Sequence, residues 1–371
     1  MIRLRALLDR PDVLRRTALA SLAANVGIVI TGGVVRLTGS GMGCPTWPRC
    51  EPDSLVATPE LGYHGAIEFG NRSLISVVGG LAVAGALLAL LQRPRRRDRL
   101  TWAGLVVAGV LAQAVLGGAT VHTVLNPWVV SAHFLLSIAV IAAAYRFWVA
   151  SREPAGSVRR VTGTATRALS WLLFGVTAAV LAVGTVVTGS GPYAGDATAR
   201  RTGLNPGTVA QLHADLVMLL IGLSVGLLVL APAALRRAAA VLVGVELAQG
   251  AIGFAQYLTH LPAVLVGLHM AGACAVWLAT LSVLTAGRLR EPAPLPNAAP
   301  SIPAAPQDAP VPAVPEGGAV AEGAAVADGA AVALGAEGAA VAGGAEGAVQ
   351  GQRAPSRARI ASASRSAAPG A

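Results

Sequence analysis

Hydrophobic residues along this chain fall into blocks of roughly 20 residues, each followed by a short polar segment. An α-helix rises about 1.5 Å per residue, so each block is long enough to cross a hydrocarbon layer of about 30 Å. Within lipid, every backbone amide must find its hydrogen-bond partner inside its own segment, which makes these blocks helices and not strands. The pattern predicts eight transmembrane helices, near residues 17–36, 66–91, 101–120, 128–149, 168–188, 209–231, 238–258 and 263–286.

The composition and the charge pattern agree with a membrane protein. Hydrophobic residues make up 54% of the 371 positions and charged residues 12%, about half the share of charge that is typical of soluble domains. Arginines cluster in alternate segments between the apolar blocks, at 1–16, 93–99, 151–167, 236–237 and 288–290. By the positive-inside rule, these segments and both termini are cytoplasmic. The net charge of +10 therefore indicates the orientation of a multi-pass protein in the lipid bilayer of a cell membrane, and not binding to nucleic acid.

The membrane part contains an internal repeat, in which one sequence unit occurs twice. VVRLTGSG at 34–41 recurs as VVTGSG at 186–191, and QAVLGGA at 113–119 recurs as QGAIGFA at 249–255. In both copies a histidine follows the glutamine after twenty positions, at His133 and His269. We therefore expect an all-α integral membrane protein whose eight helices form two repeated four-helix bundles.

This organisation divides the chain into five parts. From about residue 289 the sequence turns to Ala, Gly and Pro with recurring GAAVA units, a composition typical of disorder because glycine interrupts any regular helix. The expected parts are a cytoplasmic segment 1–16, a first bundle 17–150, a cytoplasmic linker 151–167, a second bundle 168–288 and a disordered cytoplasmic tail 289–371.

Polar side chains inside the predicted helices are few and lie at one level. An ionisable group at the centre of a bilayer costs about 2.5–3.5 kcal/mol, so each is a candidate for function. These groups fall within the first two turns of the four helices that enter from the outer face. They are Glu68, Asn71 and Arg72, then His133, then His213 and Asp215, and finally His269.

The second bundle offers two imidazoles at matching depth, His213 and His269. Heme iron takes two axial ligands, neutral imidazole is a good ligand for it, and a helical bundle provides the apolar slot that its macrocycle needs. A hydrogen bond to a neighbouring helix is the ordinary role of a single membrane histidine. The repeat-related pair favours axial ligation.

The first bundle is different. His133 takes the position of His269, but Asn71, a poor iron ligand, stands nearest to the position of His213. His64 lies one turn before Glu68 and is the candidate for a second ligand. Glu68 is either a carboxylate of a reaction site or the partner of a salt bridge with Arg72, four residues further on.

Two cysteines, Cys44 and Cys50, lie six residues apart in the first outer loop. An oxidising outer environment allows them to form a disulfide. A zinc site would need more ligands nearby.

Several motifs together resemble the heme A synthase family, of the actinobacterial type, over roughly residues 17–288. They are VVRLTGSGMGCPTWPRC at 34–50, EFGNR at 68–72, HFLLS at 133–137, VTGSGPYAGD at 187–196, HADLV at 213–217 and HMAGA at 269–273. The resemblance implies oxidation of a methyl group of heme O to the formyl group of heme A, for assembly of terminal oxidases. It also implies a heme O synthase as donor of the substrate and a heme-copper terminal oxidase as recipient of the product.

The resemblance also implies roles for particular residues. In the family, the second half holds heme b, matching His213 and His269, and the first half takes the substrate heme, matching His133. The helix glutamate implicated in catalysis matches Glu68, and the outer cysteine pair matches Cys44 and Cys50. Two positions depart from the family pattern, because Asn71 and Tyr193 stand where histidine is common.

We expect Arg36 and Arg72, at the outer level of the helices, to pair with heme propionates, since guanidinium makes bidentate contacts with carboxylates. An alternative function is that of a di-heme membrane cytochrome b that acts only in electron transfer, although Asn71 weighs against two ligands for each iron. A transporter built on parallel repeats is a third class, which usually shows paired helix breaks at the midplane. The sequence is compatible with an oligomer.

Overall fold

The structure, a computed structural model, describes residues 11–291. Eight helices in this part are long and apolar enough to cross a membrane, which confirms the prediction of an all-α, multi-pass membrane protein. The helices are α2 (Pro11–Leu37), α3 (Gly62–Leu91), α4 (Arg97–His122), α5 (Pro127–Arg152), α6 (Thr164–Ser190), α7 (Pro206–Leu230), α8 (Ala233–Leu258) and α9 (Ala263–Ala286). The expected tail lies outside the described residues from position 292 onward.

Most of these helices are longer than the apolar blocks that predicted them. α2 begins at Pro11 because the polar residues before position 17 continue the helix beyond its apolar part. α5 and α7 each begin at a proline preceded by an asparagine, and the side chains of Asn126 and Asn205 accept hydrogen bonds from the backbone amides of Trp128 and Thr208. A capping side chain followed by proline at the first helical position is a strong start signal.

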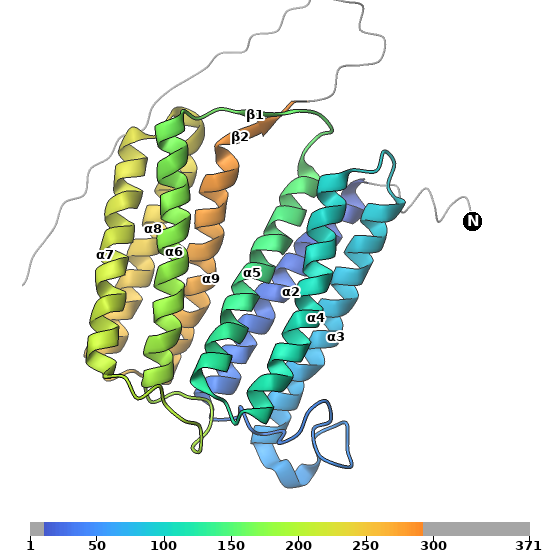
Figure 1. The fold of residues 1–371 in the computed structure, drawn as a ribbon, viewed down its shortest axis with the longest axis vertical. Helices are drawn as coiled ribbons and strands as arrows, with labels where there is room; N and C mark the ends of the chain where they lie inside the picture. The colour runs from blue at the N-terminus through green and yellow to red at the C-terminus, as the bar shows by residue number, and fades with distance from the viewer. Residues whose placement is uncertain (1–10, 292–371) are drawn as a thin grey trace, which may run out of the picture. The chain divides into compact units, whose positions relative to one another are not determined.

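The helices form two groups of four, shown side by side in Figure 1. In the first group α2 packs against α3 and α5, and α4 against α3 and α5. In the second group α6 packs against α7 and α9, and α8 against α7 and α9. The order of neighbouring helices is therefore the same in both groups, as expected for two bundles of the same topology. Their origin from a repeat stays a prediction.

The two bundles meet where α5 contacts α9 and α6, and where α9 contacts α2. The indole Nε1 of Trp277 on α9 donates a hydrogen bond of 2.9 Å to the carbonyl oxygen of Ile138 on α5. Nearer the cytoplasmic side of the predicted topology, the hydroxyls of Tyr145 and Thr285 lie 3.0 Å apart. Because both contacts are made by residues of different bundles, they fix the bundles against each other.

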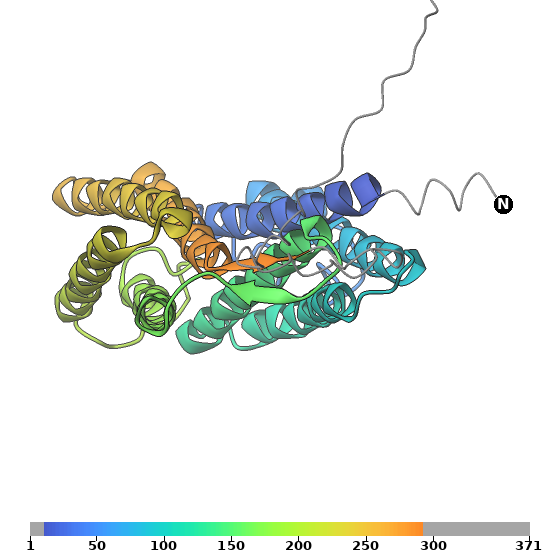
Figure 2. The same cartoon turned by 90° about the horizontal axis from the view of Figure 1, so that it is seen from above.

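The loops that follow α2, α4, α6 and α8 all lie at one end of the helices, together with the 3₁₀ helix η1 (Pro59–Leu61) (Figure 1). This disulfide end carries the loop with Cys44 and Cys50. At the opposite end, the strand end, β1 (Val158–Arg160) pairs antiparallel with β2 (Arg288–Arg290), as Figure 2 shows from above.

Ion pairs reinforce the strand end. Arg290 lies 2.9 Å from Asp98 and 3.1 Å from Glu153, and Arg288 lies 2.8 Å from Glu153. These contacts join the start of α4, the linker between the bundles and the segment after α9. Hydropathy did not predict the strand within the linker at 151–167, because three residues of mixed polarity carry no recognisable period.

Candidate functional site

The candidate site residues lie about two turns into the helices that begin at the disulfide end. Glu68, His133 and His269 are each the seventh residue of α3, α5 and α9, and His213 is the eighth residue of α7. Since all four helices start at the same end (Figure 1), equal positions along them correspond to similar depth.

His213 and His269 face each other across the second bundle. Their ring centres lie 6.4 Å apart, and the ring planes make an angle of 72°. An imidazole nitrogen lies roughly 1.1 Å from its ring centre, so two rings bound at about 2 Å to opposite sides of one metal have centres about 6.3 Å apart. The observed separation therefore fits a metal held between the two imidazoles.

The three membrane histidines share an unsatisfied atom. Nδ1 of His133, His213 and His269 is buried and has no hydrogen-bond partner among the described residues. A buried polar atom without a partner costs about 1–3 kcal/mol. Nδ1 of none of the three forms an interhelical hydrogen bond with the described residues, so each ring keeps a nitrogen that can act as a ligand.

Each of these rings packs edge-on against a glycine of the preceding helix. A Cβ atom on Gly117, Gly184 or Gly253 would lie 3.1–3.2 Å from Cε1 of His133, His213 or His269, respectively. That distance is closer than normal van der Waals contact, so these three positions favour glycine. The glycines form part of a cradle that holds each imidazole.

A glutamine on the same preceding helix fixes the backbone of two of the histidines. Nε2 of Gln113 donates to the carbonyl oxygen of His133 at 3.1 Å and to the hydroxyl of Ser137 at 2.8 Å. Nε2 of Gln249 donates to the carbonyl oxygen of His269 at 2.6 Å. The repeated glutamine–histidine spacing in the sequence thus corresponds to the same contact in both bundles.

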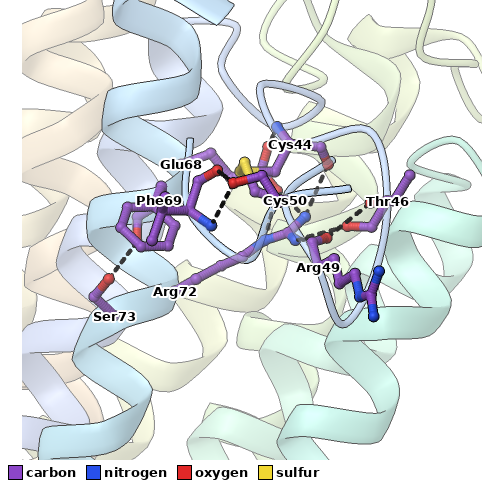
Figure 3. The surroundings of a disulfide bond; sticks show 10 residues. Cys44, Thr46, Arg49, Cys50, Glu68, Phe69, Arg72 and Ser73 are labelled. Atoms are coloured by element: carbon purple, nitrogen blue, oxygen red, sulfur yellow. Dashed lines mark hydrogen bonds and ion pairs between the residues drawn. A yellow bond between two sulfur atoms is a disulfide. The ribbon is translucent and has the colours of Figure 1, made fainter. Parts of the chain in front are cut away.

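Glu68 is buried, with 6% of its surface exposed, and both of its carboxylate oxygens are engaged (Figure 3). Oε2 accepts a hydrogen bond of 2.6 Å from the backbone amide of Cys44. Oε1 accepts from Arg72, at 2.5 Å from Nη2 and 3.1 Å from Nε. The salt bridge that the sequence offered as an alternative is therefore present, within a larger network.

Arg72 extends this network to the outer loop. Its guanidinium donates to the carbonyl oxygens of Cys44 at 2.9 Å and Thr46 at 2.7 Å, and the disulfide between Cys44 and Cys50 is formed, as predicted. Glu68 and Arg72 together anchor the disulfide loop to α3 (Figure 3). The guanidinium group is thereby committed to protein groups.

The remaining predicted residues have other contacts. Asn71 faces α2, where its Oδ1 accepts a hydrogen bond of 2.7 Å from Thr31. Nδ1 of His64 lies 3.0 Å from the hydroxyl of Ser40 in the loop after α2. Because this contact engages Nδ1, it leaves Nε2 of His64 for a ligand. The role of His64 as a second ligand opposite His133 stays a prediction.

Arg36 lies at the end of α2, where its Nε donates a hydrogen bond of 2.6 Å to the carbonyl oxygen of Tyr193. A cavity of about 290 Å³ beside it is lined by Arg36, Tyr193, Asp196, Arg201 and neighbouring residues. Two arginines at one cavity suit an anionic group such as a carboxylate. The structure does not bring Arg36 and Arg72 into one contact network among the described residues.

One buried acid was not predicted from the sequence: Glu246 on α8 is 4% exposed and accepts a hydrogen bond of 2.9 Å from Ser224 on α7. A single carboxylic acid within the apolar stretch 238–255 was the available signal. It was overlooked because it lies outside the layer of histidines.

Comparison with known proteins identifies the family. The cytochrome oxidase assembly protein family COX15-CtaA matches residues 15–281, which is most of the chain. The chain belongs to this family. Relatives named heme A synthase include a protein of Geobacillus kaustophilus that is 30% identical over 144 residues, or 38% of this chain and 44% of the relative. Another, from Exiguobacterium sibiricum, is 31% identical over 112 residues, or 30% of this chain and 37% of the relative.

The chain thus aligns with less than half of the length of either relative. The predicted resemblance to the heme A synthase family is confirmed, whereas the actinobacterial subtype stays a prediction. The three histidines and Glu68 are the candidate residues of this chain for ligand binding and catalysis.

Proposed function

We propose that this chain is a heme A synthase, which oxidises a methyl group of heme O to the formyl group of heme A for terminal oxidase assembly. The observation that carries the proposal is the separation of 6.4 Å between the ring centres of His213 and His269, in a chain that belongs to the family. A heme O synthase would supply the substrate and a heme-copper terminal oxidase would receive the product. The cell membrane, with both termini cytoplasmic, is the proposed location.

The second bundle, 168–288, would hold heme b through His213 and His269. Bound heme b supplies one-electron transfer. The residues of the chain contribute the geometry: Gly184 and Gly253 leave room for the imidazoles, and Gln249 fixes the backbone of α9 at His269. Two fixed ligands suit electron transfer because the coordination of the iron does not change.

The first bundle, 17–150, would bind heme O with His133 on its iron. Gln113 and Gly117 orient His133 as their counterparts do in the second bundle. With Asn71 bonded to Thr31, only His64 is a candidate on α3 for the opposite position. A site with one firm ligand suits a substrate, which must enter and leave.

Glu68 would act on the methyl edge of heme O. In a site that excludes water, a carboxylate stabilises positive charge that develops at the methyl carbon, or orients and deprotonates the attacking water. The amide of Cys44 and the guanidinium of Arg72 hold the side chain in one orientation. Arg36, beside its cavity, would pair with a propionate.

Pigment extraction tests the proposal. The full-length protein is purified from cells that also make heme O, and its hemes are extracted and separated by chromatography. Heme O or heme A beside heme b is the expected result. Heme b alone would instead indicate the di-heme cytochrome, and a protein without heme would indicate a transporter.

A further inference from the structure

Glu246 lies near the middle of α8, far from both ends of the helix. Its Oε1 accepts a hydrogen bond of 2.9 Å from Ser224 on α7. Its Oε2 is buried and has no partner among the described residues. A carboxyl group with one unsatisfied oxygen is thus buried between α7 and α8.

The helices packed against α8 offer no cation to this carboxyl group. α7 carries His213 and Asp215, and Asp215 is bonded to Gln211 at 2.7 Å near the disulfide end. α9 carries His269 and the thiol of Cys274. No ion pair of Glu246 is found among residues 11–291.

A carboxylate that is stabilised by one hydroxyl in an apolar interior is unfavourable, so the neutral acid competes with it. The neutral acid in turn has an O–H group that needs an acceptor. Neither form is fully satisfied by the contacts of Glu246. A small change in the local charge can therefore decide between the two forms.

The imidazole pair lies within electrostatic reach of this group. On α8, Gln249 and Gly253 follow Glu246 by three and seven residues, and these are the two residues that contact His269. Seven residues of helix place Gly253, which contacts His269, roughly 10 Å from Glu246 along the axis of α8. At that distance and an effective dielectric constant of about 20, one unit of charge changes a protonation equilibrium roughly tenfold.

We propose that Glu246 and Ser224 form a proton-binding site whose occupancy follows the charge of an iron held by His213 and His269. Glu246 takes up one proton from the aqueous phase when that iron accepts an electron from a one-electron reductant. It releases the proton when the electron leaves. The inference rests on the part of the proposed function that places a heme in the second bundle. It does not require that the protein forms heme A.

Potentiometric titration of the purified, heme-containing protein at a series of pH values tests this proposal. In the wild type, the midpoint potential of the second-bundle heme should fall as the pH rises. Glu246→Gln keeps the size of the side chain and removes its proton equilibrium, so the potential should depend much less on pH over the same range. Thr177→Val is the matched control, because it removes a buried contact with Thr280, 3.2 Å away in the same bundle, and no titratable group.

Two further measurements keep the test decisive if Glu246→Gln does not fold. Ser224→Ala removes a hydrogen bond that favours the carboxylate, so the pH-dependent region should move to higher pH. Infrared difference spectra of the wild type should show the carbonyl band of a protonated carboxyl group on reduction. A pH-independent potential in the wild type overturns the inference. So does a Glu246→Gln variant whose potential changes with pH as much as that of the wild type, and in both cases the proposed function still stands. A protein that binds no heme in the second bundle instead overturns the proposed function.

Discussion

Glu68 receives its hydrogen bonds from two different sources, the loop amide of Cys44 and the guanidinium of Arg72 on its own helix. The carboxylate therefore has a fixed orientation before any substrate is present. Such an arrangement suits electrostatic catalysis, in which groups need little reorganisation during the reaction.

Replacing Glu68 by glutamine tests its role in chemistry. Glutamine can still accept a hydrogen bond from the amide of Cys44, but it lacks the negative charge and the basicity that the reaction needs. We expect heme A formation to fall about 100-fold or more, while heme b remains bound. Extracted hemes are quantified in cells that supply heme O, with the exposed Glu60→Gln as control. Formation of heme A at the wild-type rate would remove Glu68 from the mechanism.

Arg72 is expected to stabilise the disulfide loop. In Arg72→Met, the loop loses its hydrogen bonds to the carbonyl oxygens of Cys44 and Thr46. Cys44 and Cys50 should then be reduced and alkylated several times faster under mild reductant, as followed by mass spectrometry. Arg49→Met serves as control, since that side chain is exposed and bonds only within the loop. Equal alkylation rates in the two variants would contradict the anchoring role.

The sequence predicted the residues of this network and two of its contacts, the Glu68–Arg72 pair and the disulfide, but not the contacts between the loop and the helix. The Glu68–Arg72 pair follows from a spacing of four on one helix. The bond from Cys44 to Glu68 joins positions 24 residues apart through a loop without a regular period, so no pattern in the sequence indicates it. Glu246 was missed because it lies outside the layer of histidines, and its contact with Ser224 depends on how α7 and α8 pack.

At the scale of helices, hydropathy predicted every span, and for α9 it gave the observed bounds, Ala263–Ala286. The ends of α3 at Leu91 and of α8 at Leu258 were also predicted, whereas other ends were misplaced, as at Pro11, where polar residues continue the helix. No helix contact was predicted from the glycines, and only the structure distinguishes glycines that face a histidine from those that face open space.

This distinction yields a matched pair of variants on α8. Gly253→Val places methyl groups against the ring of His269, whereas Gly250→Val points into open space. We expect Gly253→Val to lose most of the heme of the second bundle and Gly250→Val to retain it. The ratio of Soret absorbance to protein measures the difference. Equal heme content in both variants would show that the glycine cradle is not needed.

At the scale of the whole molecule, Trp277 joins the two bundles. Trp277→Phe keeps the ring packing with Phe174 but removes the hydrogen bond to Ile138, a loss of about 1 kcal/mol. Thermal unfolding in detergent should therefore begin at a temperature a few degrees lower. Trp171→Phe, at an exposed position, should leave the transition unchanged, and an equal shift in both variants would assign the effect to general loss of aromatic area.

The common level of His133, His213 and His269 has a consequence for bioenergetics. If each bundle holds a heme there, an electron that passes between them travels parallel to the plane of the bilayer. The transmembrane voltage performs work only on charge that moves along the membrane normal, about 2.3 kcal/mol per charge for 100 mV. An ionophore that abolishes the voltage should thus leave the rate of this lateral electron transfer unchanged. Any dependence of the rate on voltage would then arise from the proton that Glu246 exchanges with water.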